Sequence, residues 1–274
     1  MILHQMKDKI VIITGASSGI GKALAYEFGL KGAKVVLAAR SISKLYTISD
    51  DLHNKGIDSL IVPTDVTIEG DCRKLIEATV AKYGRIDVLI NNAGISMRAL
   101  FIDLQLDVMR RLMDTNYWGT VYCTKFAMPY LLNSSGSLVG VISIGGYVGM
   151  PGRSAYAASK FAVRGFLDTV RVENLKTGLH VLVVAPGFTS SNIRRTALLA
   201  DGSAQGETPR DEEHMMSAEE VAQYVYTAVI GRKRQLILTF VQGKLAVFLG
   251  KFVPKFLDKQ IYRTFASEPD SPLK

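Results

Sequence analysis

Tyr156 and Lys160 lie four residues apart in the segment S-A-Y-A-A-S-K-F-A, and Ser143 precedes Tyr156 by thirteen residues. On an α-helix, positions i and i+4 share one face, so the Lys160 ammonium is expected beside the Tyr156 phenol. A phenol has a pKa of about 10 and exchanges protons poorly at neutral pH unless a nearby cation stabilises its ionised form. With the Ser143 hydroxyl, the pair predicts proton transfer beside a carbonyl group. An isolated Y-x-x-x-K is usually a surface pair, so this interpretation depends on the rest of the chain.

A glycine-rich turn follows the first β-branched run of the chain. The sequence T-G-A-S-S-G-I-G spans residues 14–21, after the strand-like segment 10–14 and before a helical pattern. Gly15, Gly19 and Gly21 allow a tight strand-to-helix turn and a close approach of a phosphate to the backbone. The unpaired N–H groups of a helix N-terminus attract such an anion. The turn therefore predicts a pyrophosphate-binding site.

The residue after the second strand-like run, 34–39, bears on the choice of cofactor. An NAD site usually places an acidic residue there, whereas an NADP site offers a cation to the 2′-phosphate. This sequence has Arg40 and Ser41 and no acidic residue at that point. A guanidinium and a hydroxyl suit a phosphate, which favours NADP(H). The alternative is that Arg40 is a solvated loop charge and Ser41 caps the helix expected over 42–54.

These motifs, in their order and spacing, resemble those of the short-chain dehydrogenases/reductases of the classical type. Further matches are Asp65 with Val66, N-N-A-G at 91–94, Asn116, and P-G at 186–187. The resemblance covers residues 8–240 and identifies Asn116, Ser143, Tyr156 and Lys160 with the family's catalytic tetrad. The expected cofactor contacts are Gly15, Ser17, Ser18, Gly19, Ile20, Gly21, Arg40, Ser41, Asp65, Val66, Asn92, Ala93, Gly94, Tyr156, Lys160, Pro186, Gly187 and Thr189. Taken singly, the asparagines and the P-G pair could be structural.

The pattern of apolar runs agrees with the α/β fold that the resemblance implies. Strand-like runs at 10–14, 34–39, 59–63, 86–91, 137–142, 179–185 and 235–239 alternate with helical stretches at 67–83, 103–131 and 154–176. We expect a single Rossmann-type domain over 1–240, with a doubly wound parallel sheet of about seven strands. A helical extension is expected over 241–274.

The substrate-facing segments are mainly apolar. In this family the segment after Pro186 covers the substrate, and a lid is expected over about 188–217. The expected pocket wall comprises residues 96–101, Tyr147, Met150 and Phe188, which suits an apolar ketone better than a sugar. Arg194 and Arg195 could bind an anionic group on the substrate or form a solvated helix face.

The C-terminal extension concentrates charge and aromatic residues. Residues 231–266 hold eight basic residues and one acidic residue, in a chain with a net charge of +8. Apolar residues recur there at helical spacing beside a stripe of lysines, and Pro254 should kink the helix or start a second one. The extension could lie on a membrane as an in-plane helix, or it could pack on the domain, close the pocket or join subunits.

Other features limit location and partners. No uncharged run reaches the length of about 18 to 20 apolar residues that is needed to cross a bilayer. The N-terminus shows no signal peptide, and Cys72 and Cys123 are the only cysteines. These features favour a reducing cytoplasm, with the membrane surface as the alternative. The four histidines are scattered, which predicts no metal, and no nucleic-acid site is expected. The resemblance implies a homodimer or homotetramer through 103–131 and 154–176.

The function predicted is an NADPH-dependent oxidoreductase that interconverts a ketone or aldehyde and an alcohol on a hydrophobic, lipid- or steroid-like substrate. Tyr156 is the expected proton donor and acceptor, and a water held by Asn116 is expected to help return the proton. Two alternatives stay open. The chain could reduce 3-oxoacyl thioesters, or it could be a non-catalytic NADP-binding sensor or scaffold.

Overall fold

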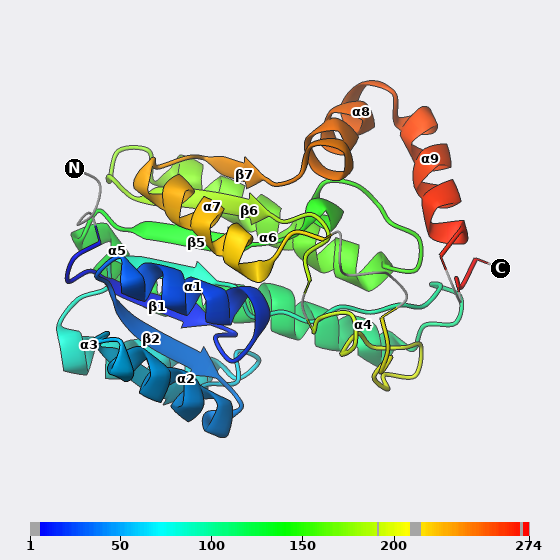
Figure 1. The fold of residues 1–274 in the computed structure, drawn as a ribbon. Coiled ribbons are helices and arrows are strands. Elements are labelled where there is room, and N and C mark those ends of the chain that lie inside the picture. The colour runs from blue at the N-terminus through cyan, green and yellow to red at the C-terminus, as the bar shows by residue number, and fades with distance from the viewer. Residues whose placement is uncertain (1–5, 191, 209–214, 269–270, 274) are drawn as a thin grey trace.

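The centre of the molecule is a parallel β-sheet, seen in a computed structural model that describes residues 6–190, 192–208, 215–268 and 271–273. Within these residues the sheet has seven strands in the order β3-β2-β1-β4-β5-β6-β7 (Figure 1). The strands are β1 (Ile10–Thr14), β2 (Lys34–Ala39), β3 (Ser59–Pro63), β4 (Val88–Asn91), β5 (Ser137–Val141), β6 (His180–Ala185) and β7 (Gln235–Ile237). This arrangement confirms the predicted fold class. The order reverses between β1 and β4, which is where such sheets open a ligand crevice.

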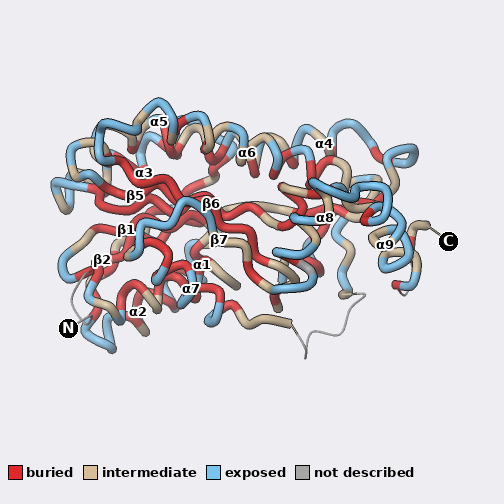
Figure 2. The backbone as a smooth tube through the Cα atoms, turned by 90° about the horizontal axis from the view of Figure 1, so that it is seen from above, coloured by how far each residue is buried: buried red, intermediate tan, exposed pale blue. Residues whose placement is uncertain are grey.

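Helices cover both faces of the sheet (Figure 2). One layer contains α1 (Gly19–Leu30), α2 (Ile42–Asn54) and α7 (Ala218–Ile230), and the other contains α3 (Glu69–Tyr83), α5 (Gly119–Asn133) and α6 (Ser154–Glu173). The five inner strands are almost wholly buried, as expected for a parallel sheet covered on two sides, whereas the edge strands β3 and β7 are partly exposed. Each fully buried Leu, Ile or Phe contributes about 1.5–3 kcal/mol to this core.

The helix expected over 103–131 differs from the prediction. It is divided into α4 (Leu106–Leu112), a π-helical turn (Met113–Trp118) and α5, which continues to Asn133. A π-helical turn accommodates an extra residue and commonly marks a functional position. Here the turn contains Asn116, one of the four predicted catalytic residues.

The strand predicted over 235–239 ends early, at Ile237. Thr239, two residues later, has φ of 65° and redirects the chain into a π-helical turn (Phe240–Leu245). Two helices follow, α8 (Ala246–Phe252) and α9 (Pro254–Ala266), so Pro254 starts a second helix, one of the two predicted outcomes. Both helices lie beyond the carboxyl ends of the strands (Figure 1). None of the helices in the described ranges has the length and apolar character needed to span a bilayer.

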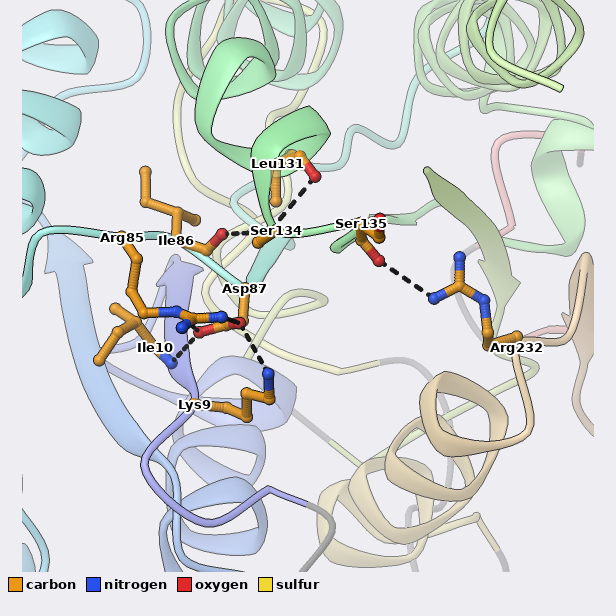
Figure 3. Close-up of polar contacts among 9 residues, drawn as sticks. All are labelled: Lys9, Ile10, Arg85, Ile86, Asp87, Leu131, Ser134, Ser135 and Arg232. Carbon is orange, nitrogen blue, oxygen red and sulfur yellow. Dashed lines mark hydrogen bonds and ion pairs between the residues drawn. The ribbon is translucent and has the colours of Figure 1, made fainter. Parts of the chain in front are cut away.

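The amino end of the sheet is held together by one buried carboxylate (Figure 3). Asp87 accepts hydrogen bonds from the Ile10 backbone N–H at 3.0 Å, from Lys9 Nζ at 3.1 Å and from Arg85 Nη2 at 2.6 Å. Burial raises the pKa of Asp87, but Arg85, the Ile10 N–H and Lys9 outweigh it and hold the pKa below its usual range. The negative charge at this end is therefore fully compensated.

Candidate active site

Two cavities meet at the carboxyl end of the sheet. The larger, of about 840 Å³, lies at the reversal of strand order, and the smaller, of about 480 Å³, lies over β5, β6 and the start of α6. Both are lined by Ile20, Asn92, Gly94 and Ile193. A molecule that fills the larger cavity can therefore reach a group bound in the smaller one. We call them the dinucleotide cavity and the catalytic cavity.

Three of the four predicted catalytic residues line the catalytic cavity. Ser143 follows β5, and its hydroxyl oxygen accepts a hydrogen bond from the Gly145 N–H at 3.2 Å. Tyr156 and Lys160 lie one turn apart on α6 and are both almost wholly buried. The turn packs closely against this wall of the cavity, because a Cβ at Gly145 would lie 2.5 Å from Met150 Cε and in van der Waals contact with the Tyr156 ring at 3.4 Å. The predicted constellation is thus assembled in one place.

The electrostatics of the pair differ from the expectation. Burial raises the pKa of Tyr156, and the neighbouring Ser143 hydroxyl only partly opposes that rise. Burial lowers the pKa of Lys160 to about 8. Lys160 Nζ donates to the Val141 carbonyl at 2.9 Å and lies 5.9 Å from the centre of the Tyr156 ring. In this arrangement Tyr156 is a protonated acid at neutral pH, and Lys160 is a buried cation whose proton is easily lost.

Asn116 lies at the π-helical turn and connects three elements. Its Oδ1 accepts from the Ile95 N–H at 2.8 Å, while its Nδ2 donates to the Ile95 carbonyl at 3.0 Å and to Ser159 Oγ at 2.9 Å. A side chain at Gly94 would crowd this contact, since a Cβ would lie 3.0 Å from Asn116 Oδ1 and 3.3 Å from Lys160 Nζ. Asn116 therefore holds the loop after β4 against α6. Both Nδ2 hydrogens and one Oδ1 lone pair are used in that role.

The dinucleotide cavity is lined by most of the predicted cofactor contacts. Gly15 and Gly19 have φ of 67° and 50°, a region that favours glycine, and a Cβ at Gly15 would lie 2.9 Å from the Ala93 Cα. Gly21 lines neither cavity; a side chain there would collide with the Gly15 carbonyl, so its role is helix packing. The other predicted contacts that line this cavity are Ser17, Ser18, Ile20, Arg40, Ser41, Asp65, Val66, Asn92, Ala93 and Gly94. The glycine turn and the cavity volume of about 840 Å³ fit a dinucleotide.

The remaining predicted cofactor contacts line the catalytic cavity instead. These are Tyr156, Lys160, Pro186, Gly187 and Thr189. Asn92 and Gly94 line both cavities, so a long molecule such as a dinucleotide could contact both sets of predicted residues. One end of a dinucleotide would occupy each side of the junction.

A second cation lies beside Arg40 and was missed in the sequence. Lys44, in the first turn of α2, lines the dinucleotide cavity together with Arg40 and Ser41. Within the described residues, neither cation makes an ion pair, and the first turn of α2 contains no acidic residue. The sequence could have indicated this second cation, because Lys44 lies only two residues after the expected start of the helix.

The predicted pocket wall is partly correct. Ser96, Met150 and Phe188 line the catalytic cavity, but Tyr147 and Phe101 do not. Tyr147 instead packs its ring against the Arg164 guanidinium, 4.0 Å away, and Phe101 is exposed. Arg194 is buried and donates to the Thr189 carbonyl at 2.9 Å, so it is not part of a solvated helix face, whereas Arg195 is exposed.

The expected lid over 188–217 is described only in part. Residues 191 and 209–214 lie outside the described residues, as do His4 and His214 among the histidines. Ile193 of the described part lines both cavities, and Thr189 pairs with Met216 through an isolated parallel bridge. In the ranges that the structure describes, no group of three His, Cys, Asp or Glu could hold a metal ion.

The outer wall of the catalytic cavity is made by the C-terminal extension. Packing of the extension on the domain was one of several alternatives predicted from the sequence, without a prediction of which residues would make the contact. The extension residues that line the cavity are Val241, Leu245, Ala246, Leu249, Leu257, Gln260, Ile261, Thr264 and Phe265. Arg98 and Glu268 anchor it through an ion pair of 3.4 Å in which the two side chains are only 10% and 7% exposed. The extension is thus an integral part of the site.

The fold and the site define an oxidoreductase, and the chain belongs to the short-chain dehydrogenase family. The model of that family, described as short chain dehydrogenase, matches residues 9–201. The chain is 36% identical over 254 residues to mouse dehydrogenase/reductase SDR family member 7B, covering 91% of this chain and 79% of the mouse protein. It is 38% identical over 200 residues to 11-beta-hydroxysteroid dehydrogenase-like 4A of Arabidopsis thaliana, covering 72% and 67%.

Solved structures share the fold. A short-chain dehydrogenase/reductase from Burkholderia phymatum in complex with NAD superimposes with a TM-score of 0.77 at 22% identity, covering 85% of this chain and 89% of that one. An alcohol dehydrogenase from Thermococcus sibiricus complexed with 5-hydroxy-NADP gives a TM-score of 0.73 at 21% identity, covering 84% and 94%. At these identities the likeness concerns the fold alone.

Proposed function

We propose that the chain is an NADPH-dependent reductase that interconverts a ketone or aldehyde and an alcohol on a hydrophobic, lipid- or steroid-like substrate. The observation that carries this proposal is the position of Tyr156. Its phenol, with a raised pKa, lies beside Ser143 in a mainly apolar cavity that shares Asn92 and Gly94 with the dinucleotide cavity. A proton donor is therefore available where a substrate carbonyl would meet the cofactor.

The choice of NADPH over NADH rests on Arg40 and Lys44. Both line the dinucleotide cavity and neither lines the catalytic cavity that contains Tyr156, and no carboxylate follows β2. A guanidinium and an ammonium stabilise a 2′-phosphate, which NADH lacks. The two solved neighbours carry cofactors of both kinds, so they support a nicotinamide nucleotide without favouring either.

The substrate class rests on the walls of the catalytic cavity. Aliphatic and aromatic side chains dominate them, including Val148, Met150, Phe188, Leu249 and Leu257. A cavity of about 480 Å³ accommodates a drug-sized molecule and favours one with a large apolar surface. The name of the Arabidopsis relative refers to a hydroxysteroid, which agrees with this chemistry.

The mechanism follows from the geometry of the polar residues. When bound, the nicotinamide nucleotide supplies a hydride to the carbonyl carbon in reduction and accepts it in oxidation. Ser143 and Tyr156 donate hydrogen bonds to the carbonyl oxygen and polarise it. As the oxygen becomes an alkoxide, Tyr156 transfers its phenolic proton to it, which yields the alcohol and a phenolate.

Lys160 completes the cycle by stabilising that phenolate. Its ammonium lies on the same helix face as Tyr156, and the negative charge of the phenolate would draw it away from the Val141 carbonyl. A proton from solvent then restores the phenol. The Nδ2 group of Asn116 already donates to Ile95 and Ser159, so a water held by Asn116 would bind one of its oxygens: Oδ1, which accepts one bond from the Ile95 N–H, or the backbone carbonyl, which accepts from the Thr120 hydroxyl at 2.8 Å.

A screen of NADPH oxidation tests this function. The substrates are ketones graded by chain length and ring system, with NADH in parallel and cofactor binding measured by fluorescence. We expect turnover of large apolar ketones and a preference for NADPH. Cofactor binding without turnover of any carbonyl would instead indicate a sensor or scaffold, and turnover confined to acyl thioesters would indicate the thioester reductase.

A further inference from the structure

The C-terminal extension has two apolar faces with different surroundings. Its inner face lines the catalytic cavity with residues such as Leu249, Leu257 and Ile261. Its outer face is exposed to solvent, with residues between 44% and 72% exposed. This outer apolar face comprises Phe240, Val241, Phe248, Phe252, Val253, Phe256 and Tyr262. A cluster of this size on one short segment is typical of an interaction surface.

The outer apolar face continues into the mouth of the catalytic cavity. Val241 is 65% exposed and Leu245 is 36% exposed, yet both also line the cavity. The rings of Phe248 and Phe252 lie 4.7 Å apart on the same surface, on the helix that carries Leu249 inward. An apolar molecule on this surface can therefore pass to the cavity without crossing a polar rim at Val241 and Leu245.

Positive charges accompany the outer apolar face. Residues 240–266 contain Lys244, Lys251, Lys255, Lys259 and Arg263, and Asp258 is their only acidic residue. All five basic side chains belong to exposed residues. None of the four lysines forms an ion pair with another described residue. A stripe of uncompensated lysines beside exposed phenylalanines is typical of a helix that lies in the plane of an anionic membrane surface.

We propose that the outer apolar face docks on an anionic lipid bilayer and that the catalytic cavity opens toward the lipid, so that the substrate enters from the membrane. The part that concerns the substrate rests on the proposed reductase function. The helices α8 and α9 have 7 and 13 residues, too short to span a bilayer but suited to lie along its surface. The phenylalanines would enter the acyl region while the lysines contact phosphate and carboxylate headgroups.

A second copy of the chain fits this surface less well. A two-fold dimer pairs the same patch of both subunits. The five basic residues of one copy would then face those of the other, and a single Asp258 in each cannot compensate them. An anionic lipid surface removes that repulsion.

Vesicle flotation of the full chain tests the docking. Vesicles contain phosphatidylcholine alone or with 30% phosphatidylserine. The test variant is Phe252→Ser with Phe256→Ser, two residues that are 67% and 53% exposed and line neither cavity. The matched control is Tyr46→Ser with Tyr224→Ser, aromatic residues that are 56% and 51% exposed on α2 and α7.

We expect the wild type and the control to float with the anionic vesicles, and the test variant to lose at least about tenfold in apparent affinity. Replacing Lys251 and Lys255 with Ser should weaken binding by about fivefold for each lysine, and added salt should reduce that difference. Equal flotation of test and control variants would overturn the proposal. The proposal would also be overturned if the wild type stayed in solution as an oligomer and the test variant were a monomer.

Activity assays separate this inference from the proposed function. A short water-soluble ketone should be reduced equally by wild type and test variant, whereas a long-chain ketone in anionic vesicles should be reduced at least about tenfold more slowly by the test variant. Equal rates on the vesicle-bound ketone would overturn delivery from the membrane. If no carbonyl is reduced by any form, the reductase function fails, and the flotation result still decides the docking.

Discussion

The two ends of the sheet hold buried charge in opposite ways. At the amino end, Asp87 is surrounded by Lys9, Arg85 and the Ile10 N–H, so that its negative charge is compensated. At the carboxyl end, Lys160 is buried without a carboxylate partner among the described residues and donates only to a carbonyl. A compensated charge supports the fold, and an uncompensated one is available for chemistry. The difference explains why one end of the sheet is structural and the other is functional.

The exposed cations show the same contrast. Lys9 and Arg85, at the amino end, are partly exposed, yet both are paired with Asp87. Arg40 and Lys44, at the carboxyl end, line the dinucleotide cavity without an ion pair among the described residues. Cations that no internal carboxylate neutralises are free to bind an external phosphate. The carboxyl end is thus incomplete without a ligand.

The largest expected effect is that of Tyr156→Phe. The substitution removes the phenolic proton and leaves the ring, so the reduction rate should fall by about 10²- to 10⁴-fold. Steady-state NADPH oxidation measures this, and cofactor binding should not change. Tyr117→Phe, elsewhere in the same helical layer, serves as the control. Retention of most of the turnover would remove Tyr156 from the role of proton donor.

Removing the cation at the dinucleotide cavity should change cofactor preference. Arg40→Ala loses a charge-assisted contact to the 2′-phosphate, so the KM for NADPH should rise by about 10- to 100-fold, with little change for NADH. The exposed Arg195, which lines neither cavity, provides the matched control Arg195→Ala. An equal rise in KM for NADPH and NADH would mean that Arg40 does not bind the 2′-phosphate.

At the amino end, the same kind of change should affect stability alone. Asp87→Asn removes the charge that Lys9 and Arg85 compensate, and the free energy of unfolding should fall by about 2 kcal/mol. Urea unfolding measures it, with the exposed Asp50→Asn as control. Because the folded pKa of Asp87 is lowered, the wild type should lose this contribution only as the pH falls below the unfolded pKa of about 4 toward the folded value. If Asp87→Asn lost turnover but not stability, the amino end of the sheet would be functional and not structural, contrary to the account.

The smallest effect concerns pH. The pKa of Lys160 is about 8, so its ammonium is present below pH 8 and is lost above it. Since the ammonium stabilises the phenolate formed in reduction, kcat/KM should be constant near pH 6–7. It should fall by up to about tenfold for each pH unit above 8. A profile that stays flat to pH 10 would show that Lys160 keeps its proton or plays no part.

The sequence predicted the fold because local signals and long-range packing agree in it. The apolar runs, the glycine turn and the Y-x-x-x-K spacing all depend on neighbours in the chain, and the structure places them as expected. The π-helical turn at Asn116 could not be predicted, since it depends on hydrogen bonds to Ile95 and Ser159 far along the chain. The bond from Lys160 to the Val141 carbonyl and the packing of α9 over the cavity depend on the tertiary fold in the same way.

The most direct test of the contrast between the two ends is Lys160→Met, measured for both turnover and unfolding. The substitution removes a buried cation that no carboxylate compensates and keeps a side chain of similar length. We predict a loss of reduction rate of at least about 100-fold, with a free energy of unfolding that stays within about 1 kcal/mol of the wild type or rises. A variant that is destabilised as strongly as Asp87→Asn yet retains turnover would contradict the account.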